Sequence, residues 1–203
     1  SDWITSDFNN VEEIYYCHDM VKKISPNILV NCAGINKINS FVDINPNDFL
    51  SIQQINMFAP FMLCQAAIPS MKADRWGRIV NISSIWGKIG KEFRASYMAS
   101  KFALDGITAA IAAEYASEGI LANCIAPGFT DTELTRNTLG LKGIEDLSKR
   151  IPIKKIAKPS EIAEFVFWLA SDKNTYISGQ NMPIDGGFTV SYTHLRAHET
   201  LLY

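Results

Sequence analysis

The sequence has few of the residues that metal centres and histidine-based catalysis require. Its 203 residues include only 4 cysteines and 3 histidines. Cys17, Cys32, Cys64 and Cys124 are far apart, form no Cys-x-x-Cys pair and have no histidine cluster near them. We therefore expect no metal site, and reduced thiols in or near the core. His18 is the only histidine before the last ten residues, which argues against a histidine-based catalytic triad.

Long apolar runs and an excess of one charge are also absent. The most apolar stretch, residues 57–63, is far shorter than the roughly 20 residues of a membrane-spanning helix. Because no signal peptide precedes Ser1 either, we expect a cytoplasmic protein. The net charge of -2 argues against nucleic acid and anionic membranes as partners. With 47% hydrophobic and 20% charged residues, the sequence predicts one compact domain.

Both ends of the sequence differ from the part between them. Residues 190–203 have no apolar periodicity, and one back-translation of them resembles a transposon-end adapter used in sequencing libraries. We predict that they are a non-native tail without packed structure, with an ordinary C-terminal extension as the alternative. The chain begins close to a predicted helix, without a first strand before it, so we expect that an upstream region is missing. Residues 1–189 are then one partial domain.

Short apolar runs and longer periodic segments alternate along the chain. The predicted strands are residues 27–31, 77–84, 120–126 and 180–184, and the predicted helices are residues 11–24, 47–72, 94–117 and 160–171. This alternation predicts right-handed βαβ crossovers and a doubly wound α/β fold, in which helices cover both faces of a mostly parallel sheet. Ligands then bind outside the carboxyl ends of the strands, near a switch in strand order.

A tyrosine stands four residues before a lysine in the predicted helix of residues 94–117. This spacing places Tyr97 and Lys101 on one face, one turn apart. Because an ammonium group favours tyrosinate, we expect Lys101 to lower the pKa of the Tyr97 phenol, so that the phenol exchanges a proton near neutral pH. Such a pair also arises by chance, and the interpretation depends on further motifs.

Several ordered elements over residues 7–188 resemble the short-chain dehydrogenase/reductase family. These Rossmann-fold enzymes move hydride between NAD or NADP and a carbonyl or alcohol. The matching elements are Asn31-Cys32-Ala33-Gly34, Asn56, Ser84, Tyr97 with Lys101, residues 127–132, and Asp185-Gly186-Gly187. Ser84 precedes Tyr97 by the family's usual separation. Cys32 replaces the second asparagine of the family's Asn-Asn-Ala-Gly, which is tolerable if its side chain faces the core.

The resemblance implies a catalytic role for four residues. Tyr97 would donate and accept the proton, and Ser84 would orient the substrate oxygen, with Ser83 as the fallback. Lys101 would support the tyrosine and bind the nicotinamide ribose; its alternative is a solvated helix lysine. Asn56 would support a water chain from Lys101 to solvent, and its alternative is a buried asparagine that caps or kinks its helix.

The resemblance also implies a set of cofactor contacts. They are Asp7, Asn31, Ala33, Gly34, Tyr97, Lys101, Pro127, Gly128, Thr130 and Thr132. Asp7 would contact adenine, or would only begin the first helix. None of the 12 glycines forms Gly-x-Gly-x-x-Gly, the turn that binds a pyrophosphate. We therefore expect the first βαβ region to be missing and residues 1–203 alone to be inactive, and the cofactor is NAD or NADP.

The resemblance is greatest to 3-oxoacyl-acyl-carrier-protein reductases and related sugar or alcohol dehydrogenases. It implies an NAD(P)-dependent oxidoreductase acting on a small carbonyl or alcohol. The rival hypothesis is a non-catalytic relative that serves as an oligomerising or binding scaffold. Residues 129–159 mix charges without a long apolar run, which keeps small polar substrates open. Small residues on one helix, Ala99, Ala103, Ala109 and Ala113, permit close helix approach, and by resemblance we expect a homodimer or homotetramer.

Overall fold

A four-stranded parallel sheet forms the centre of the protein. The computed structural model describes residues 3–191, except the side chains of Leu134 and Thr138. The strands are β1 (Ile28–Asn31), β2 (Gly77–Ile82), β3 (Ile120–Pro127) and β4 (Asn181–Ile184), in the order β1-β2-β3-β4. Each pair of neighbours is parallel. All four predicted strands are confirmed, and their carboxyl ends lie at one edge of the sheet. The described strands contain no reversal of order, so the expected switch point is not among them.

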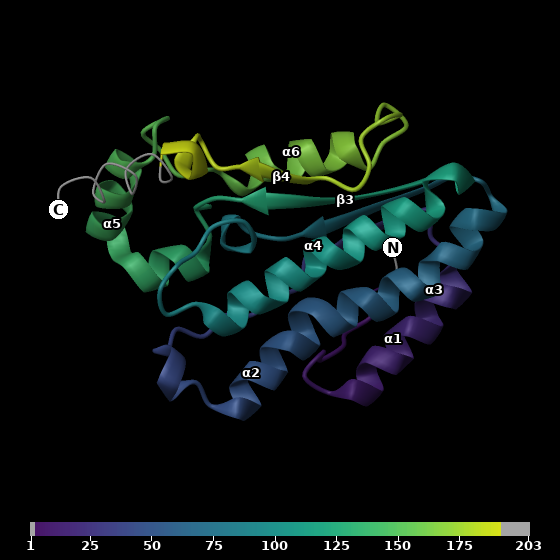
Figure 1. Ribbon diagram of the computed structural model, residues 1–203, viewed down its shortest axis with the longest axis horizontal. Helices are drawn as coiled ribbons and strands as arrows, with labels where there is room; N and C mark the ends of the chain where they lie inside the picture. The colour runs from purple at the N-terminus through teal and green to yellow at the C-terminus, as the bar shows by residue number, and fades with distance from the viewer. Residues whose placement is uncertain (1–2, 192–203) are drawn as a thin grey trace.

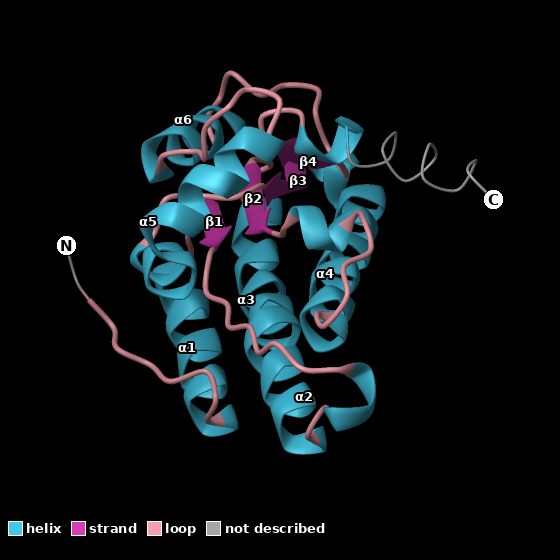
Figure 2. Ribbon diagram, turned by 90° about the vertical axis from the view of Figure 1, so that its left-hand side faces the viewer, coloured by secondary structure: helices cyan, strands magenta, loops and turns pink. Residues whose placement is uncertain are grey.

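Helices cover both faces of this sheet. On one face lie α1 (Val11–Ile24), α3 (Ala59–Ala73) and α4 (Ala95–Tyr115), and on the other lies α6 (Pro159–Leu169) (Figures 1 and 2). The alternation of side chains along β2 follows this division, because Ile79 packs in the cluster with α3 and Val80 in the cluster with α6. The predicted Rossmann-like α/β fold is confirmed.

One crossover differs from the prediction. The connections from β1 to β2 and from β2 to β3 cross on the face of α3 and α4, whereas the connection from β3 to β4 crosses through α6 on the opposite face (Figure 2). Because the sheet grows in the same direction at each step, a change of face reverses the hand of the crossover. The three connections therefore cannot all be right-handed, and the prediction of right-handed crossovers throughout is wrong.

The long helix predicted for residues 47–72 consists of three parts. They are α2 (Pro46–Gln53), the π-helical turn η2 (Gln54–Phe58) and α3. Pro60 has no N–H to donate to the carbonyl of Asn56 four residues earlier, and its ring crowds that carbonyl. The helix widens at this point, which places Asn56 in the wide turn. The sequence contains the cause, Pro60, but the periodicity alone predicts a continuous helix.

The region beyond β3 contains a helix that the sequence analysis missed. The helix α5 (Glu133–Arg150) lies at the carboxyl ends of the strands (Figure 1). Its apolar pattern is weak, and the backbone of Gly140 is non-helical, with φ 64° and ψ 175°. Three single turns of 3₁₀ helix complete the secondary structure: η1 (Phe41–Asp43), η3 (Ile85–Gly87) and η4 (Ala116–Glu118).

The outer face of β1 is not covered within the described part of the chain. Ile28 and Val30 are 47% and 42% exposed, and Phe167 of α6 nearby is 76% exposed. Leu29, which points to the other face, packs against the core under α3 and α4. The strand β1 thus carries apolar side chains on both faces, but only the face toward α3 and α4 is covered.

The structure describes only the first two residues of the predicted C-terminal tail. Val190 and Ser191 continue a helical turn that begins at Phe188, and the amide of Ser191 donates to the carbonyl of Gly187 at 3.2 Å. These two residues are helical, and the prediction of a non-native tail stays a prediction. Residues 192–203, the rest of that tail, lie outside the described residues. No helix among residues 3–191 is both long enough and apolar enough to cross a membrane.

Candidate active site

Ser84 lies where β2 ends and the 3₁₀ turn η3 begins. It is the N-cap of this turn, is 7% exposed, and its Oγ accepts a hydrogen bond from the amide of Trp86 at 3.2 Å. The neighbouring Ser83 has a different environment. Its Oγ donates to the backbone carbonyl of Lys101 at 3.4 Å and would lie 2.8 Å from a Cβ atom at Gly87. Ser83 thus joins η3 to α4, and Ser84 remains the predicted serine of the site.

The phenol of Tyr97 lies against Ser84. Tyr97 occupies the first turn of α4, and its phenol lies close enough to Ser84 for that hydroxyl to affect its pKa. Burial raises the pKa of Tyr97 above its ordinary value, while the Ser84 hydroxyl and the charge of Arg94 lower it by less. The prediction that Lys101 lowers this pKa is therefore wrong for this structure, because loss of hydration outweighs the nearby positive charge. The phenol keeps its proton at neutral pH.

Lys101 lies buried beside the tyrosine ring. It is 3% exposed, and its Nζ lies 5.5 Å from the centroid of the Tyr97 ring. Nζ donates a 2.7 Å hydrogen bond to the carbonyl of Ile82, the last residue of β2. Burial lowers the pKa of Lys101 to about 8. These contacts exclude the alternative of a solvated helix lysine.

Asn56 connects the π-helical turn to the loop after β1. The side chain is fully buried, accepts from the amide of Ile35 at 2.8 Å, and donates to the carbonyl of Ile35 at 2.9 Å and to Oγ of Ser100 at 3.0 Å. A Cβ atom at Gly34 would lie 3.4 Å from Oδ1 of Asn56 and 3.5 Å from Nζ of Lys101. The amide therefore holds the Gly34 backbone over the lysine, and the predicted water chain from Asn56 stays a prediction.

Asn31 belongs to a buried network between the strands and α4. Its Nδ2 donates to Oδ1 of Asn81 at 2.7 Å, and Nδ2 of Asn81 donates to Oγ1 of Thr108 at 2.8 Å. Thr108 contacts Sγ of Cys124 at 3.1 Å and donates to the carbonyl of Leu104 at 2.8 Å. The Asn31 side chain is thus engaged in the core, and its predicted cofactor contact stays a prediction.

A cavity of about 680 Å³ runs from the carboxyl ends of the strands along the inner face of α6. Predicted cofactor residues border it: Pro127, Thr130 and Thr132. Cys32 also lines it and is exposed, so the expectation that this side chain faces the core is wrong. Among the four thiols, all of which are free, only Cys64 and Cys124 are buried.

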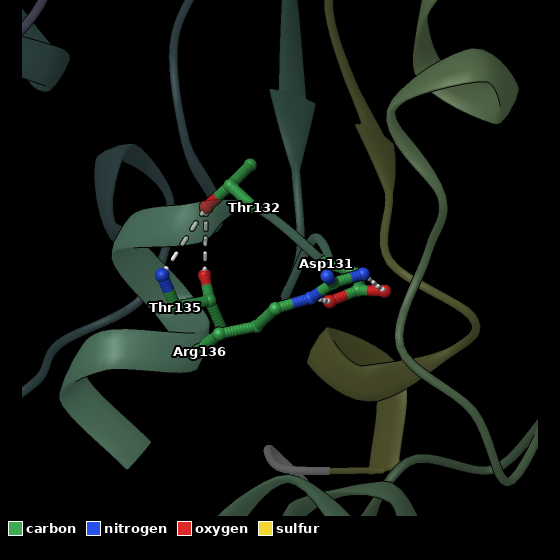
Figure 3. A network of polar contacts seen from close by, with 4 residues as sticks. All are labelled: Asp131, Thr132, Thr135 and Arg136. Carbon is green, nitrogen blue, oxygen red and sulfur yellow. Dashed lines mark hydrogen bonds and ion pairs between the residues drawn. The ribbon is translucent and has the colours of Figure 1, made fainter. Parts of the chain in front are cut away.

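The loop between β3 and α5 is held by its own polar contacts (Figure 3). Arg136 binds Asp131 through two bonds, Nε to Oδ1 at 2.6 Å and Nη2 to Oδ2 at 2.7 Å, and these lower the pKa of the Asp131 carboxyl. Oγ1 of Thr132 caps α5 by accepting from the amide of Thr135 at 3.3 Å. The Thr132 hydroxyl thus has a structural partner at the rim of the cavity.

The other predicted cofactor residues lie farther from the catalytic group or have local roles. Oδ1 of Asp7 accepts from the amide of Asn9 at 2.9 Å in the turn that leads into α1, as in the alternative interpretation of Asp7. Gly128 passes so close to Asp185 that an added Cβ atom would lie 2.8 Å from its Cα, so close packing also requires a glycine there. Ala33 is exposed beside Gly34 at the end of β1.

Two further features of the site escaped the sequence analysis. Trp86 and Arg94, which neighbour Ser84 and Tyr97 in the chain, line a cavity of about 320 Å³ together with residues of α5. The position of Arg94 three residues before Tyr97 was a sequence signal for its place in the site. No sequence signal indicated that α5 contributes to this cavity, because its apolar pattern is weak. The described residues contain no cluster of three His, Cys, Asp or Glu side chains that could hold a metal ion.

Comparison with known proteins agrees with this geometry. Residues 4–189 match the family described as enoyl-(acyl carrier protein) reductase. The 3-oxoacyl-(acyl-carrier-protein) reductase FabG of Pseudomonas aeruginosa is 37% identical over 166 residues, which are 82% of this chain and 67% of that protein. The corresponding reductase of Rickettsia conorii is 37% identical over 179 residues, 88% of this chain and 74% of the relative.

Solved structures show the same fold. Gluconate 5-dehydrogenase from Burkholderia cenocepacia J2315, in complex with NADP and tartrate, has a TM-score of 0.83 at 29% identity, covering 91% of this chain and 73% of that one. ElxO with NADP bound has a TM-score of 0.84 at 28% identity, covering 93% and 78%.

The fold, the paired serine and tyrosine, and the buried lysine define a Rossmann-like oxidoreductase. This chain belongs to the short-chain dehydrogenase/reductase family, whose members are NAD(P)-dependent oxidoreductases.

Proposed function

We propose that this chain carries the catalytic group of an enzyme that reduces a small carbonyl compound to a secondary alcohol, with Tyr97 as the general acid. The observation that supports this most directly is the contact of the Tyr97 phenol with Ser84 beside the buried ammonium of Lys101. The raised pKa of Tyr97 keeps the phenol protonated at neutral pH, which suits the donor of a proton.

The chemistry follows from the positions of these side chains. NAD(P)H, when bound, supplies the hydride that adds to the carbonyl carbon. Ser84 donates a hydrogen bond to the carbonyl oxygen and orients it toward Tyr97. The phenol proton passes to that oxygen as the carbon–oxygen double bond becomes single. The ammonium of Lys101 stabilises the tyrosinate that remains until a proton from solvent restores the phenol.

The residues around Lys101 fit the nicotinamide end of such a cofactor. An ammonium group has three N–H donors, and within the described residues Nζ of Lys101 donates to one acceptor, the carbonyl of Ile82. The remaining donors can bind ribose hydroxyls. Gly34 brings bare backbone beside this ammonium. We propose NADP as the first cofactor to test, because the neighbours ElxO and gluconate 5-dehydrogenase were solved with NADP.

We also propose that the competent enzyme needs a glycine-rich phosphate-binding turn in addition to residues 1–203. The sequence contains no Gly-x-Gly-x-x-Gly, and the outer face of β1 is apolar and exposed at Ile28 and Val30. We expect calorimetry of residues 1–203 with NAD or NADP to give weak or no binding, together with a tendency to aggregate through this edge. Micromolar affinity of residues 1–203 for either nucleotide would contradict the proposal.

We expect the enzyme to be a homodimer or homotetramer. On α4, Ala99, Ala109 and Ala113 are exposed, and exposed Phe61 and Phe102 lie on α3 and α4. Small side chains beside apolar ones permit two copies of such a helix pair to pack about a two-fold axis. Sedimentation at micromolar concentration should give a dimer or tetramer, and Ala109→Glu should shift it toward monomer. A wild-type monomer would reject this assembly.

We propose a cytoplasmic location, because all four thiols are free and two of them, in Cys17 and Cys32, are at least partly accessible.

A further inference from the structure

The cavity beside the catalytic group has an aromatic wall. Its volume of about 320 Å³ is at the lower end for ligand pockets and fits part of a small substrate. The rings of Trp86, Phe129 and Phe188 pack edge to face, with centroids 5.2 to 6.1 Å apart. These residues come from η3, from the loop after β3 and from the turn after β4, so the wall is formed only in the folded chain.

This cavity opens next to the atoms that are proposed to react. Trp86, which lines the cavity, donates its amide to Oγ of Ser84 at 3.2 Å, so the cavity adjoins the residue that carries that hydroxyl. Arg94, also in the lining, precedes Tyr97 by about one helical turn, and its charge acts on the phenol. Ser84 and Tyr97 are not themselves in the lining, but each lies beside a lining residue, so a substrate that reaches past Trp86 or Arg94 enters this cavity.

Two guanidinium groups in the lining have no partner of opposite charge among the residues that the structure describes. Lys91 is paired with Glu92, and Asp146 is paired with Lys149. The side chains of Arg94 and Arg150 form no ion pair or hydrogen bond with any residue in the described range 3–191. Within residues 3–191, the cavity thus contains two positive charges without an ion-pair partner, beside Lys91 and Asp146, which are paired elsewhere.

The position of Arg94 is unfavourable for the helix that carries it. Arg94 is the N-cap of α4 and makes no capping hydrogen bond. The positive end of the helix dipole disfavours a cation there, and an Asn, Asp or Ser would stabilise the helix better. Arg94 is also half-buried, which costs hydration. A bound anion would compensate for both effects.

We propose that this cavity selects a carbonyl substrate that bears an anionic group, a carboxylate or a phosphate, and that Arg94 and Arg150 bind this group while the aromatic wall packs against the carbon chain. The inference rests on the proposed carbonyl reduction. The planar fork of a guanidinium binds either anion through two hydrogen bonds. Arg94 and Arg150 are specificity-determining residues in this account, and neither transfers the proton.

Kinetics on matched substrates test the proposal. The substrates are oxo-carboxylates of increasing chain length, their methyl esters, and the corresponding oxoalkyl phosphates, reduced by this chain joined to a relative's glycine-rich turn. Arg150→Met should lower kcat/KM for the charged substrates by roughly 10- to 100-fold and leave the esters within a few fold. The comparison of carboxylates with phosphates identifies the preferred anion. Lys142→Met, an exposed lysine on the same helix and outside the lining of the cavity, is the matched control.

Arg94→Met should have the same selective effect, but its charge also acts on Tyr97, so Arg150→Met is the cleaner variant. Equal losses on acids and esters, or a wild-type preference for the esters, would overturn the proposal and leave the proposed reduction standing.

A binding measurement separates the proposed anion site from the proposed carbonyl reduction. Calorimetry of residues 1–203 with succinate and with inorganic phosphate should detect binding that Arg150→Met removes and Tyr97→Phe preserves. If this pattern holds but no carbonyl is reduced, the proposed function fails and the anion site stands. If neither anion binds, or if Arg150→Met binds them as the wild type does, the anion site is wrong.

Discussion

Replacing Tyr97 by phenylalanine should lower kcat for carbonyl reduction by about 10²- to 10⁴-fold, the usual contribution of general acid–base catalysis. The substitution keeps the ring in its place at the start of α4 but removes the proton that Ser84 and the raised pKa hold ready for the substrate oxygen. The alkoxide would then form without a donor in a partly dehydrated site. Steady-state kinetics with the joined chain at saturating NADPH measure this loss, and the affinity for the cofactor should change little.

Tyr115→Phe is the matched control for this experiment. Tyr115 ends the same helix and packs at the other end of the core under α3 and α4. It should retain the activity of the wild type. If Tyr97→Phe kept more than about a tenth of the wild-type kcat, Tyr97 would not be the acid.

Replacing Lys101 by methionine should lower both the rate and the affinity for the cofactor. Methionine keeps much of the buried stem but removes the ammonium that lies 5.5 Å from the Tyr97 ring and that we propose binds the ribose. We expect kcat to fall by at least about 10²-fold, because the developing tyrosinate loses its counter-charge. Cofactor titration should show weaker binding in the same variant. Lys72→Met, an exposed lysine on α3, is the control.

The pH profile gives a second test of Lys101. Burial lowers its pKa to about 8, so the ammonium is present below that pH and is lost as the pH rises through it. The phenol of Tyr97, with its raised pKa, stays protonated over this range. The kcat/KM for reduction should therefore fall above about pH 8 in the wild type, and this step should be missing in Lys101→Met. A wild-type profile that stays flat to pH 10 would show that the charge of Lys101 is not needed.

The local elements of this protein could be predicted from the sequence. Each of them depends on a few neighbouring residues. Examples are the strands with short apolar runs, the helix boundaries at Val11 and Ile24, and the i,i+4 spacing of Tyr97 and Lys101. Such patterns are governed by side-chain periodicity and backbone hydrogen bonding, which act over one or two turns. The order of these elements was sufficient to indicate the family, and with it the role proposed for Ser84.

Other properties depend on segments that are far apart in the chain. The pKa of Tyr97 rises because several elements remove water from the phenol, whereas the sequence shows only the lysine four residues away. The exposure of Cys32 and the position of α6 across the sheet depend on which face each crossover takes.

The cavity lined by Arg94 and Arg150 also depends on segments that are far apart in the chain. One arginine begins α4 and the other ends α5, a helix whose weak apolar pattern did not reveal it. The sequence by itself therefore determined the elements and their chemistry, because these depend on neighbouring residues. Only the tertiary structure decided the charge, hydration and lining of the site, because burial and electrostatics sum over every segment that packs around it.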